Sequence, residues 1–169
     1  MLDSKNIWDA KRRTDDLLTR EKFKQVLQAQ KTRRENDSFY DFAVFEKKTG
    51  DLIGSVSAMD VLRGVAQTAF LGYGIYNRYW GKGYAKEAVR ALIDIAFTDL
   101  SLHRLEAGIE PANRRSIMLA RSLKLRKEGL KKRAIYLRET WIDLVMYSAT
   151  CEDFSYSYRW KKKPTLRLR

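Results

Sequence analysis

The stretch from Arg78 to Ala85, which reads R-Y-W-G-K-G-Y-A, constrains this chain more than any other part of its sequence. It follows an apolar run that ends at Ile75 and Tyr76, and it precedes residues with the apolar period of an amphipathic helix. The first N–H groups of a helix are unpaired, the helix dipole favours negative charge there, and glycines let an anion approach. The pattern therefore predicts a strand, a phosphate-binding loop and a helix, with an ordinary glycine turn as the alternative.

The spacing of Gly81 and Gly83 excludes two common classes of phosphate-binding motif. The dinucleotide fingerprint needs G-x-G-x-x-G, and the nucleoside-triphosphate loop needs G-x-x-x-x-G-K-[ST]. Neither pattern is present here, so we expect a pyrophosphate of another kind. Lys82 and Arg78 would supply positive charge beside it.

The remaining periodicities predict a mixed α/β (α+β) architecture. A helix is expected to follow the N-cap Thr19 and to bury Phe23, Val26 and Leu27. Further helices are expected at residues 82–98 and after the cap Asn113, and strands at 39–46, 52–61, 65–76, 103–110, 126–133 and 140–150. An antiparallel meander followed by alternating strands and helices indicates a mixed sheet with helices on its faces.

Two glycines interrupt the strand that precedes the loop. Gly72 and Gly74 are separated by a single residue, a spacing that suggests a β-bulge or a close backbone approach. A strand merely loosened by glycines is the alternative.

The loop has the form R-x-x-G-x-G-x-A and resembles the acetyl-CoA pyrophosphate loop of the GNAT acetyltransferases. The longer phrase at residues 72–76 and 79–88 is similar to the ribosomal-protein N-terminal (alanine/serine) acetyltransferase branch of that family. Three further blocks follow in the family's order, at residues 103–106, 111–116 and 141–148. The resemblance extends from about residue 37 to residue 149.

The resemblance implies a GNAT-type mixed, mostly antiparallel sheet flanked by helices. We expect a GNAT N-acetyltransferase domain at residues 1–150 and a basic C-terminal extension at residues 151–169. Family members usually open with a strand that carries an L-x-L-R-like phrase, which the first residues here lack. The chain is therefore expected to lack that strand or to begin upstream, and the C-terminal tail or a second subunit could cover the open edge.

The resemblance also assigns residues to acetyl-CoA, the expected cosubstrate, and no metal is expected. The assigned cofactor-binding residues are Ile75, Tyr76, Arg78, Gly81, Lys82, Gly83, Tyr84, Ala85, Asn113 and Ser116. Ile75 and Tyr76 would contact the pantetheine arm where two strands splay apart. Ser116 is the catalytic candidate because it would lie near the CoA sulfur, while Ala120 replaces the tyrosine that many relatives use as an acid.

The general base is not identified by the sequence. Phe70 and Ile135 stand where relatives often carry carboxylates. Glu110 and Glu139 are substitutes, and a water chain would also suffice because the amine needs only to be neutral. His103, the single histidine, is expected to lie away from the acetyl group.

Charge and cysteine content bear on partners and on compartment. With 34 Lys and Arg against 21 Asp and Glu, the net charge is +13, which favours anionic partners. Basic residues end the chain, with Tyr156, Tyr158 and Trp160 among them. The tail is therefore expected either to contact RNA or a ribosome or to be a solvated tail.

We expect a cytoplasmic protein without a membrane partner. The evidence is the lone Cys151, the absence of a signal-like start and the absence of a membrane-length apolar run.

The favoured function is an acetyl-CoA-dependent N-acetyltransferase acting on a protein N-terminal amine, such as that of a ribosomal protein, as a monomer or homodimer. Direct attack in a ternary complex is expected, since no nucleophile for a covalent intermediate is evident. The alternatives are a polyamine or antibiotic acetyltransferase, and a weakly catalytic module that binds CoA or RNA. A cationic acceptor would be repelled at long range by the net charge of +13.

Overall fold

The computed structural model describes residues 19–158 of the 169-residue chain. In the described part, α-helices (α), 3-10 helices (η) and strands (β) follow in this order: α1 (Arg20–Glu35), β1 (Tyr40–Phe45), β2 (Leu52–Leu62), β3 (Thr68–Ile75), η2 (Asn77–Tyr79), α2 (Tyr84–Thr98), β4 (Arg104–Ile109), α3 (Arg114–Ser122), β5 (Arg126–Leu137), β6 (Thr140–Thr150) and η3 (Glu152–Phe154). The expected α+β mixed sheet is confirmed. The long strand expected at 65–76 begins three residues later, and β5 extends past residue 133.

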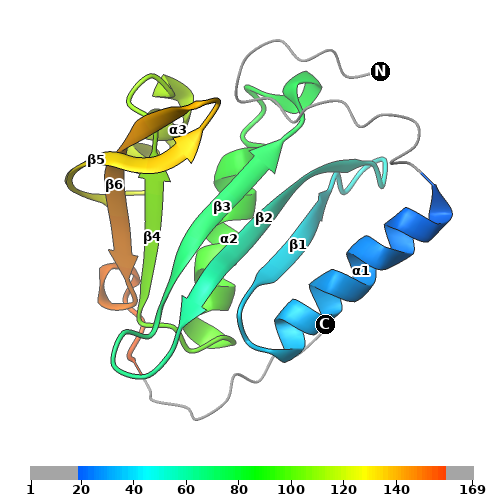
Figure 1. Ribbon diagram of the computed structural model, residues 1–169, viewed down its shortest axis with the longest axis horizontal. Helices are drawn as coiled ribbons and strands as arrows, with labels where there is room; N and C mark the ends of the chain where they lie inside the picture. The colour runs from blue at the N-terminus through cyan, green and yellow to red at the C-terminus, as the bar shows by residue number, and fades with distance from the viewer. Residues whose placement is uncertain (1–18, 159–169) are drawn as a thin grey trace.

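The six strands form one sheet in the order β1-β2-β3-β4-β6-β5 (Figure 1). Every neighbouring pair is antiparallel except β3 and β4, which run parallel. The parallel register covers only Thr68–Arg104, Ala69–Leu105 and Phe70–Glu106. Since β3 continues to Ile75 and β4 to Ile109, the two strands separate beyond Phe70 and Glu106. A gap therefore opens in the middle of the sheet.

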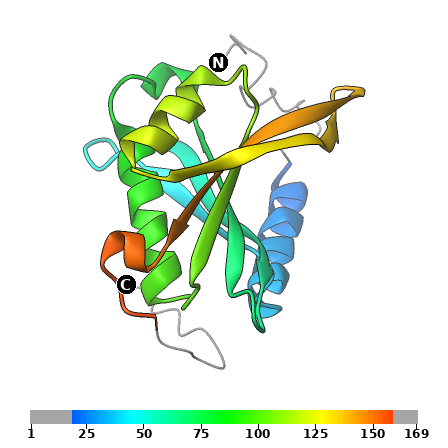
Figure 2. The ribbon, with the colours of Figure 1, turned by 90° about the vertical axis from the view of Figure 1, so that its left-hand side faces the viewer.

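The helices lie on both sides of this sheet (Figure 2). α2 and α3 cover one face, whereas α1 lies on the other side, and the β5–β6 hairpin projects toward the side of α1. The core forms between the sheet and α2, whose buried residues are Ala88, Val89, Leu92, Ile93, Ala96 and Phe97. The helical period expected for this segment is thus confirmed. In the described part of the chain no helix is long and apolar enough to cross a bilayer.

The expected burial of the first helix is wrong. Thr19 is its N-cap as expected, accepting a hydrogen bond from the Lys22 N–H at 3.3 Å. Phe23, Val26 and Leu27, however, are 55%, 37% and 48% exposed. A helical period shows that apolar residues share a face, but it does not show that another element covers that face.

The expected bulge at Gly72 and Gly74 is also absent. Both residues pair in regular register with Ser57 and Ser55, and the irregularity between β2 and β3 lies between Met59 and Leu62. The alternative, a close backbone approach, is found between Gly74 and Gly54, because a Cβ on Gly54 would lie 2.1 Å from the Gly74 carbonyl oxygen.

The segment after β6 packs on the domain as far as the structure describes it. Cys151 is buried, and the Tyr156 hydroxyl donates to Asp94 of α2 at 2.7 Å. Tyr158 stacks edge-on against His103 at 5.3 Å between ring centroids. These two tyrosines are engaged in protein packing, whereas Trp160 and the basic residues of the tail lie outside the described residues.

Candidate functional site

The loop before α2 has the backbone conformation that an anion site needs. Gly81 and Gly83 have φ values of 75° and 85°, in the left-handed region that favours glycine. Gly83 is the N-cap of α2, and no side chain caps this helix start. A Cβ built on either glycine would meet no atom within 4 Å. Open space therefore lies beside the first turn of α2, where unpaired N–H groups and the helix dipole favour a phosphate.

Two tyrosines anchor this loop to the β1–β2 hairpin. Tyr79 donates to Asp51 at 3.1 Å, Tyr84 donates to Glu46, and the two rings meet edge-on at 6.1 Å. The hydrogen bond to Glu46 is the main cause of the raised pKa of Tyr84, and the same bond lowers the pKa of Glu46. Because the Tyr84 side chain is held by the hairpin, only its backbone remains for an anion.

The cations predicted for this site lie on the loop. The Arg78 guanidinium lies 4.7 Å and the Lys82 ammonium 5.5 Å from the centre of the Tyr79 ring. Cation–π contacts of this length orient the charge without neutralising it. The structure thus brings Arg78 and Lys82 together with the two glycines.

The strand before the loop presents backbone groups toward the gap. The Tyr76 N–H donates to Ile53 O at 2.9 Å, so the backbone of Tyr76 faces β2. In an antiparallel pair the facing alternates, so Tyr73 and Ile75 direct their backbone groups to the opposite side, beyond the end of the β3–β4 pairing. The Ile75 carbonyl is already used, because it accepts from the Trp80 indole N–H at 2.6 Å. The Ile75 N–H fits the predicted contact to a pantetheine arm, whereas the Tyr76 N–H is occupied.

The start of α3 lies close to the loop. Asn113 is the N-cap of α3 and accepts from the Ser116 N–H at 3.2 Å, as its position in the sequence suggests. The Arg115 guanidinium stacks over the Trp80 ring at 4.2 Å. The predicted residues Asn113 and Ser116 therefore belong to the same region as the glycine loop, although 30 residues separate Gly83 from Asn113.

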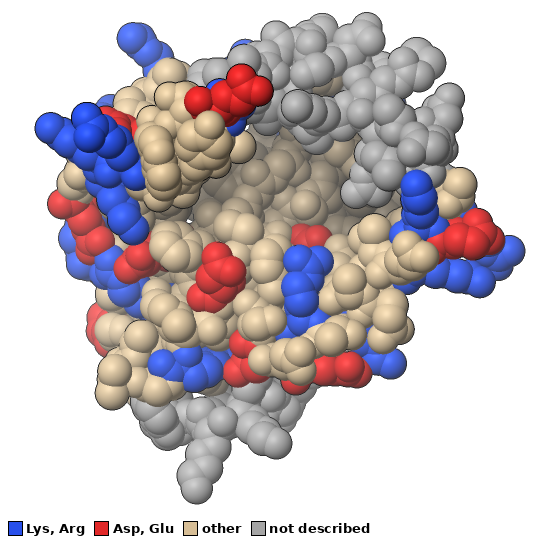
Figure 3. Space-filling model, in the orientation of Figure 1, with Lys and Arg blue, Asp and Glu red and all other residues tan. Residues whose placement is uncertain are grey.

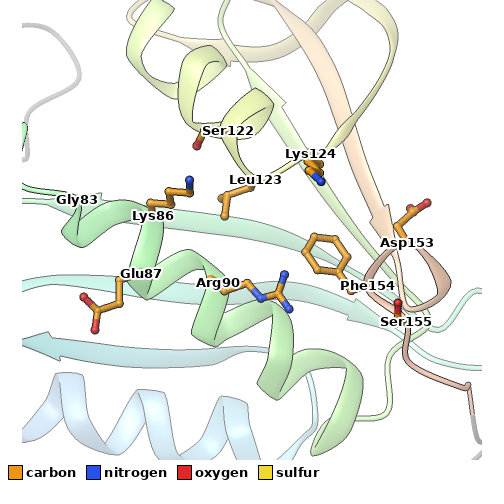
Figure 4. Close-up of a pocket in the computed structure, with 10 residues that line it drawn as sticks. All are labelled: Gly83, Lys86, Glu87, Arg90, Ser122, Leu123, Lys124, Asp153, Phe154 and Ser155. Atoms are coloured by element: carbon orange, nitrogen blue, oxygen red, sulfur yellow. The ribbon is translucent and has the colours of Figure 1, made fainter.

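A cavity of about 650 Å³ lies beside Gly83, between α2, α3 and η3 (Figure 4). Lys86 and Arg90 of α2 and Lys124 after α3 line it together with the acids Glu87 and Asp153, and Phe154 lies under Arg90 at 4.7 Å. This volume is in the usual range for small-molecule sites. Three basic and two acidic side chains leave the lining with one net positive charge, and the Phe154 ring offers a surface for a planar group.

The opposite face of the sheet has a hollow that opens beside the β5–β6 hairpin (Figure 3). Around it the described surface is mostly uncharged. The hairpin itself exposes Ile135, Tyr136, Leu137 and Trp141, and the Tyr136 and Trp141 rings meet edge-on at 5.5 Å. The predicted anion site and this mostly uncharged surface thus lie on opposite faces of the sheet, with the gap between β3 and β4 between them.

The two carboxylates considered as general bases, Glu110 and Glu139, differ in burial and in ion pairing. Glu110 follows β4, is 14% exposed, and accepts from the Arg138 guanidinium at 2.6 Å. Glu139 is exposed at the turn of the hairpin. Phe70 lies at the end of the β3–β4 pairing and Ile135 lies on the hairpin, and neither side chain can accept a proton.

His103 lies apart from the loop. Its imidazole is 3.1 Å from Glu152, and with Cys151 these residues form the one group of three or more metal-ligating types found among residues 19–158. Burial and the neighbouring Glu152 raise the pKa of the Cys151 thiol to about 11, so the thiol is protonated at neutral pH.

Two residues of the site were missed by reasoning from the sequence. Trp80 and Tyr73 both lie in the stretch that carries the family resemblance, but neither was among the predicted site residues. Their roles depend on the Ile75 carbonyl, on Arg115 and on Ser116, which only the folded chain brings near them.

The chain belongs to the GNAT acetyltransferase family, because the model of the Acetyltransferase (GNAT) domain matches residues 4–126. Among curated relatives, the probable N-acetyltransferase YjcK of Bacillus subtilis is 37% identical over 131 residues, which are 78% of this chain and 72% of the relative. The [ribosomal protein uS5]-alanine N-acetyltransferase of Escherichia coli is 31% identical over 122 residues, which are 72% of this chain and 62% of the relative. The aligned region thus covers about two thirds of these relatives.

Solved structures agree with this membership. The ribosomal-protein-S5-alanine acetyltransferase of Vibrio fischeri superimposes with a TM-score of 0.75 at 29% identity, over 86% of this chain and 79% of that one. Mycobacterium smegmatis RimJ, solved with CoA-disulfide, gives a TM-score of 0.75 at 25% identity, over 82% and 65% of the two chains. The expected GNAT-type sheet and the resemblance to the ribosomal-protein acetyltransferase branch are confirmed.

Proposed function

We propose that this chain is an acetyl-CoA-dependent N-acetyltransferase whose acceptor is the N-terminal amine of a protein. The observation that carries the proposal is the pair of left-handed glycines that opens α2 beside the end of the β3–β4 pairing. A pyrophosphate held by the first turn of α2 would leave the pantetheine arm free to enter the gap. The reactive end would then face the hollow on the other side of the sheet.

The residues present fit acetyl-CoA. The amides of Gly81 to Ala85 would hold the pyrophosphate, and the cavity lined by Lys86, Arg90 and Lys124 would take the nucleotide end. The Ile75 N–H would pair with the arm, and Asn113 and Ser116 would lie at its far end. When bound, acetyl-CoA supplies an acetyl group activated as a thioester.

Within that complex the protein would accelerate the reaction mainly by holding acetyl-CoA and the amine in the correct orientation. Holding both reactants together can remove on the order of 7–11 kcal/mol of barrier. The Ser116 hydroxyl would donate a hydrogen bond to the departing sulfur, since free serine is too weak an acid for full proton transfer. A neutral amine attacks directly, with its proton leaving through water or through Glu110.

The acceptor is argued from the relatives and from the surface. Relatives in Escherichia coli and Vibrio fischeri are named for ribosomal protein S5 or uS5 and alanine. Exposed aromatic and aliphatic side chains on the hairpin suit a peptide, whereas a polyamine or aminoglycoside would want an acidic surface. A ribosomal substrate would place the reaction in the cytoplasm.

The test is a turnover assay with acetyl-CoA across three acceptor classes. We expect acetylation of peptides that begin with alanine or serine and little turnover of spermidine or aminoglycosides. Preferred turnover of a polyamine or an antibiotic would assign the chain to the small-molecule class. Tight binding of acetyl-CoA without turnover of any amine would instead identify a non-catalytic binding module.

The cofactor loop can be tested separately by calorimetry. Gly83→Ala introduces a Cβ into the space assigned to the phosphate, so acetyl-CoA affinity should fall by at least about tenfold. A non-glycine residue at positive φ costs about 1–2 kcal/mol wherever it stands. Gly64→Ala is the matched control, because Gly64 has a φ of 64°, lies in the β2–β3 turn and also has open space around it. Equal loss of affinity in both variants would contradict the site.

A further inference from the structure

Tyr73 carries a buried hydroxyl that has no hydrogen-bond partner within residues 19–158. It lies on β3, three residues beyond Phe70, where the pairing with β4 ends. The side chain packs against the core, and its hydroxyl has no partner among the described residues. Buried polar groups without partners are rare in folded proteins, and each asks for an explanation.

The polar neighbour of this hydroxyl is Ser116. The Ser116 side chain lies close enough to influence the titration of Tyr73, although the two oxygens do not meet hydrogen-bond geometry. Tyr73 comes from β3, and Ser116 comes from the first turn of α3, which follows β4. Tyr73 thus lies on the strand at one side of the gap, and Ser116 lies on the helix that follows the strand at its other side.

The Tyr73 phenol is protonated at neutral pH and can therefore donate a hydrogen bond. Burial raises the pKa of the phenol, and the Ser116 hydroxyl only partly opposes this shift. At neutral pH the O–H is therefore present. Ala120, which stands where the family resemblance expects an acidic tyrosine, is buried at 3% exposure and offers no polar group.

We propose that Tyr73 is a further catalytic residue, whose hydroxyl donates a hydrogen bond to the CoA sulfur as the acetyl group leaves. The proposal rests on the proposed function, since it needs acetyl-CoA in the gap. In the reaction, the bond between the amine nitrogen and the acetyl carbon forms, and the carbon–sulfur bond breaks with its electron pair moving to sulfur. The amine gives up one proton and the sulfur finally takes one, so CoA leaves as the thiol and Tyr73 is unchanged. Its O–H stabilises the negative charge on sulfur before that proton arrives.

The test compares Tyr73→Phe with Tyr158→Phe. Both substitutions keep the ring and remove a buried hydroxyl that lacks a partner, but Tyr158 stacks on His103, apart from the glycine loop. In Tyr73→Phe we expect kcat to fall by about 10- to 100-fold while the KM for acetyl-CoA changes less than about twofold. Tyr158→Phe should leave both unchanged.

A second readout needs no acceptor. Bound CoA is titrated by the absorbance of its thiolate. The pKa of the thiol should be higher in Tyr73→Phe than in the wild type by about one unit, because Ser116 then remains as a donor to the thiolate without Tyr73. An equal thiol pKa in the two proteins, or absence of CoA binding, would overturn the proposal. A shifted thiol pKa in a protein that acetylates no amine would support Tyr73 while refuting the proposed function.

Discussion

Cys151 shows how a single residue limits the chemistry. It is the chain's one cysteine, it is buried at 1% exposure, and its pKa is raised to about 11. At pH 7 the thiolate is then on the order of one part in 10,000, so an acetylated cysteine has no evident route of formation. We predict that mass spectrometry after incubation with acetyl-CoA alone shows the unmodified chain.

Cys151→Ser provides the control for this prediction. The substitution removes the only thiol and changes the side-chain volume little, so turnover should stay within about twofold of the wild type. A stoichiometric adduct on Cys151 that passes its acetyl group to an amine would show that transfer is not direct.

At the residue scale, the sequence predicted those site residues whose role is set by the local backbone conformation. Gly81, Gly83 and the cap Asn113 were found because turns and helix starts restrict which residues can stand there. Tyr73 was not found, because Ser116 is 43 positions away and no local pattern records their approach.

At the scale of elements, the hydrogen bond between Tyr84 and Glu46 ties the start of α2 to the β1–β2 hairpin. We predict that Tyr84→Phe weakens acetyl-CoA binding by about three- to tenfold, because the hydrogen bond that holds the helix start in place is lost. Calorimetry measures the affinity. Thr49→Ala is the control, since it removes the Thr49–Glu46 bond of 2.9 Å and leaves the Tyr84 bond intact. Equal affinity in Tyr84→Phe and the wild type would show that the loop needs no such anchor.

The helices and strands were largely predictable from the sequence, but the elements that pack against them were not. α2 has a stripe of apolar residues at helical spacing, and the structure buries that stripe. The helix expected after Thr19 also forms, yet Phe23 and Leu27 remain exposed because periodicity fixes a helix face and not its partner. The early end of the β3–β4 pairing follows from the family resemblance, since nothing in the sequence of β4 itself marks it.

At the scale of the whole molecule, Arg63 joins three distant parts of the chain. Its guanidinium donates twice to Asp37 at 2.7 Å, once to Gln67 at 3.2 Å and once to the Leu100 carbonyl at 2.8 Å. The strand order β1-β2-β3-β4, which brings these residues together, cannot be read from local periodicity. Burial by itself would raise the pKa of Asp37, but hydrogen bonds from Arg63 and Tyr40 and the Arg63 charge outweigh it and lower the pKa.

This network predicts a pH-dependent loss of stability. A carboxylate whose pKa is lowered on folding stabilises the fold above its unfolded pKa, here 3.8, and the contribution disappears as the pH falls through the folded value. Asp37→Asn should therefore lower the free energy of unfolding by about 1–3 kcal/mol at pH 7, and by progressively less below pH 3.8. Urea unfolding at both pH values measures this. Glu35→Gln is the control, because the Lys31–Glu35 pair is exposed, and a pH-independent effect of Asp37→Asn would contradict the assignment.

The basic tail carries a large share of the positive charge of the whole molecule. Residues 159–169 contain six Lys and Arg and no acid, so their removal lowers the net charge from +13 to +7. The cut belongs after Tyr158, because Tyr156 and Tyr158 contact Asp94 and His103 of the domain. If the tail steers the protein to RNA or ribosomes, this truncation should weaken the association and reduce its dependence on salt, by about one unit of slope for each phosphate no longer neutralised. Acetyl-CoA affinity should not change, since the glycine loop lies within the domain. Full RNA affinity together with a lower melting temperature would show that the tail stabilises the domain instead.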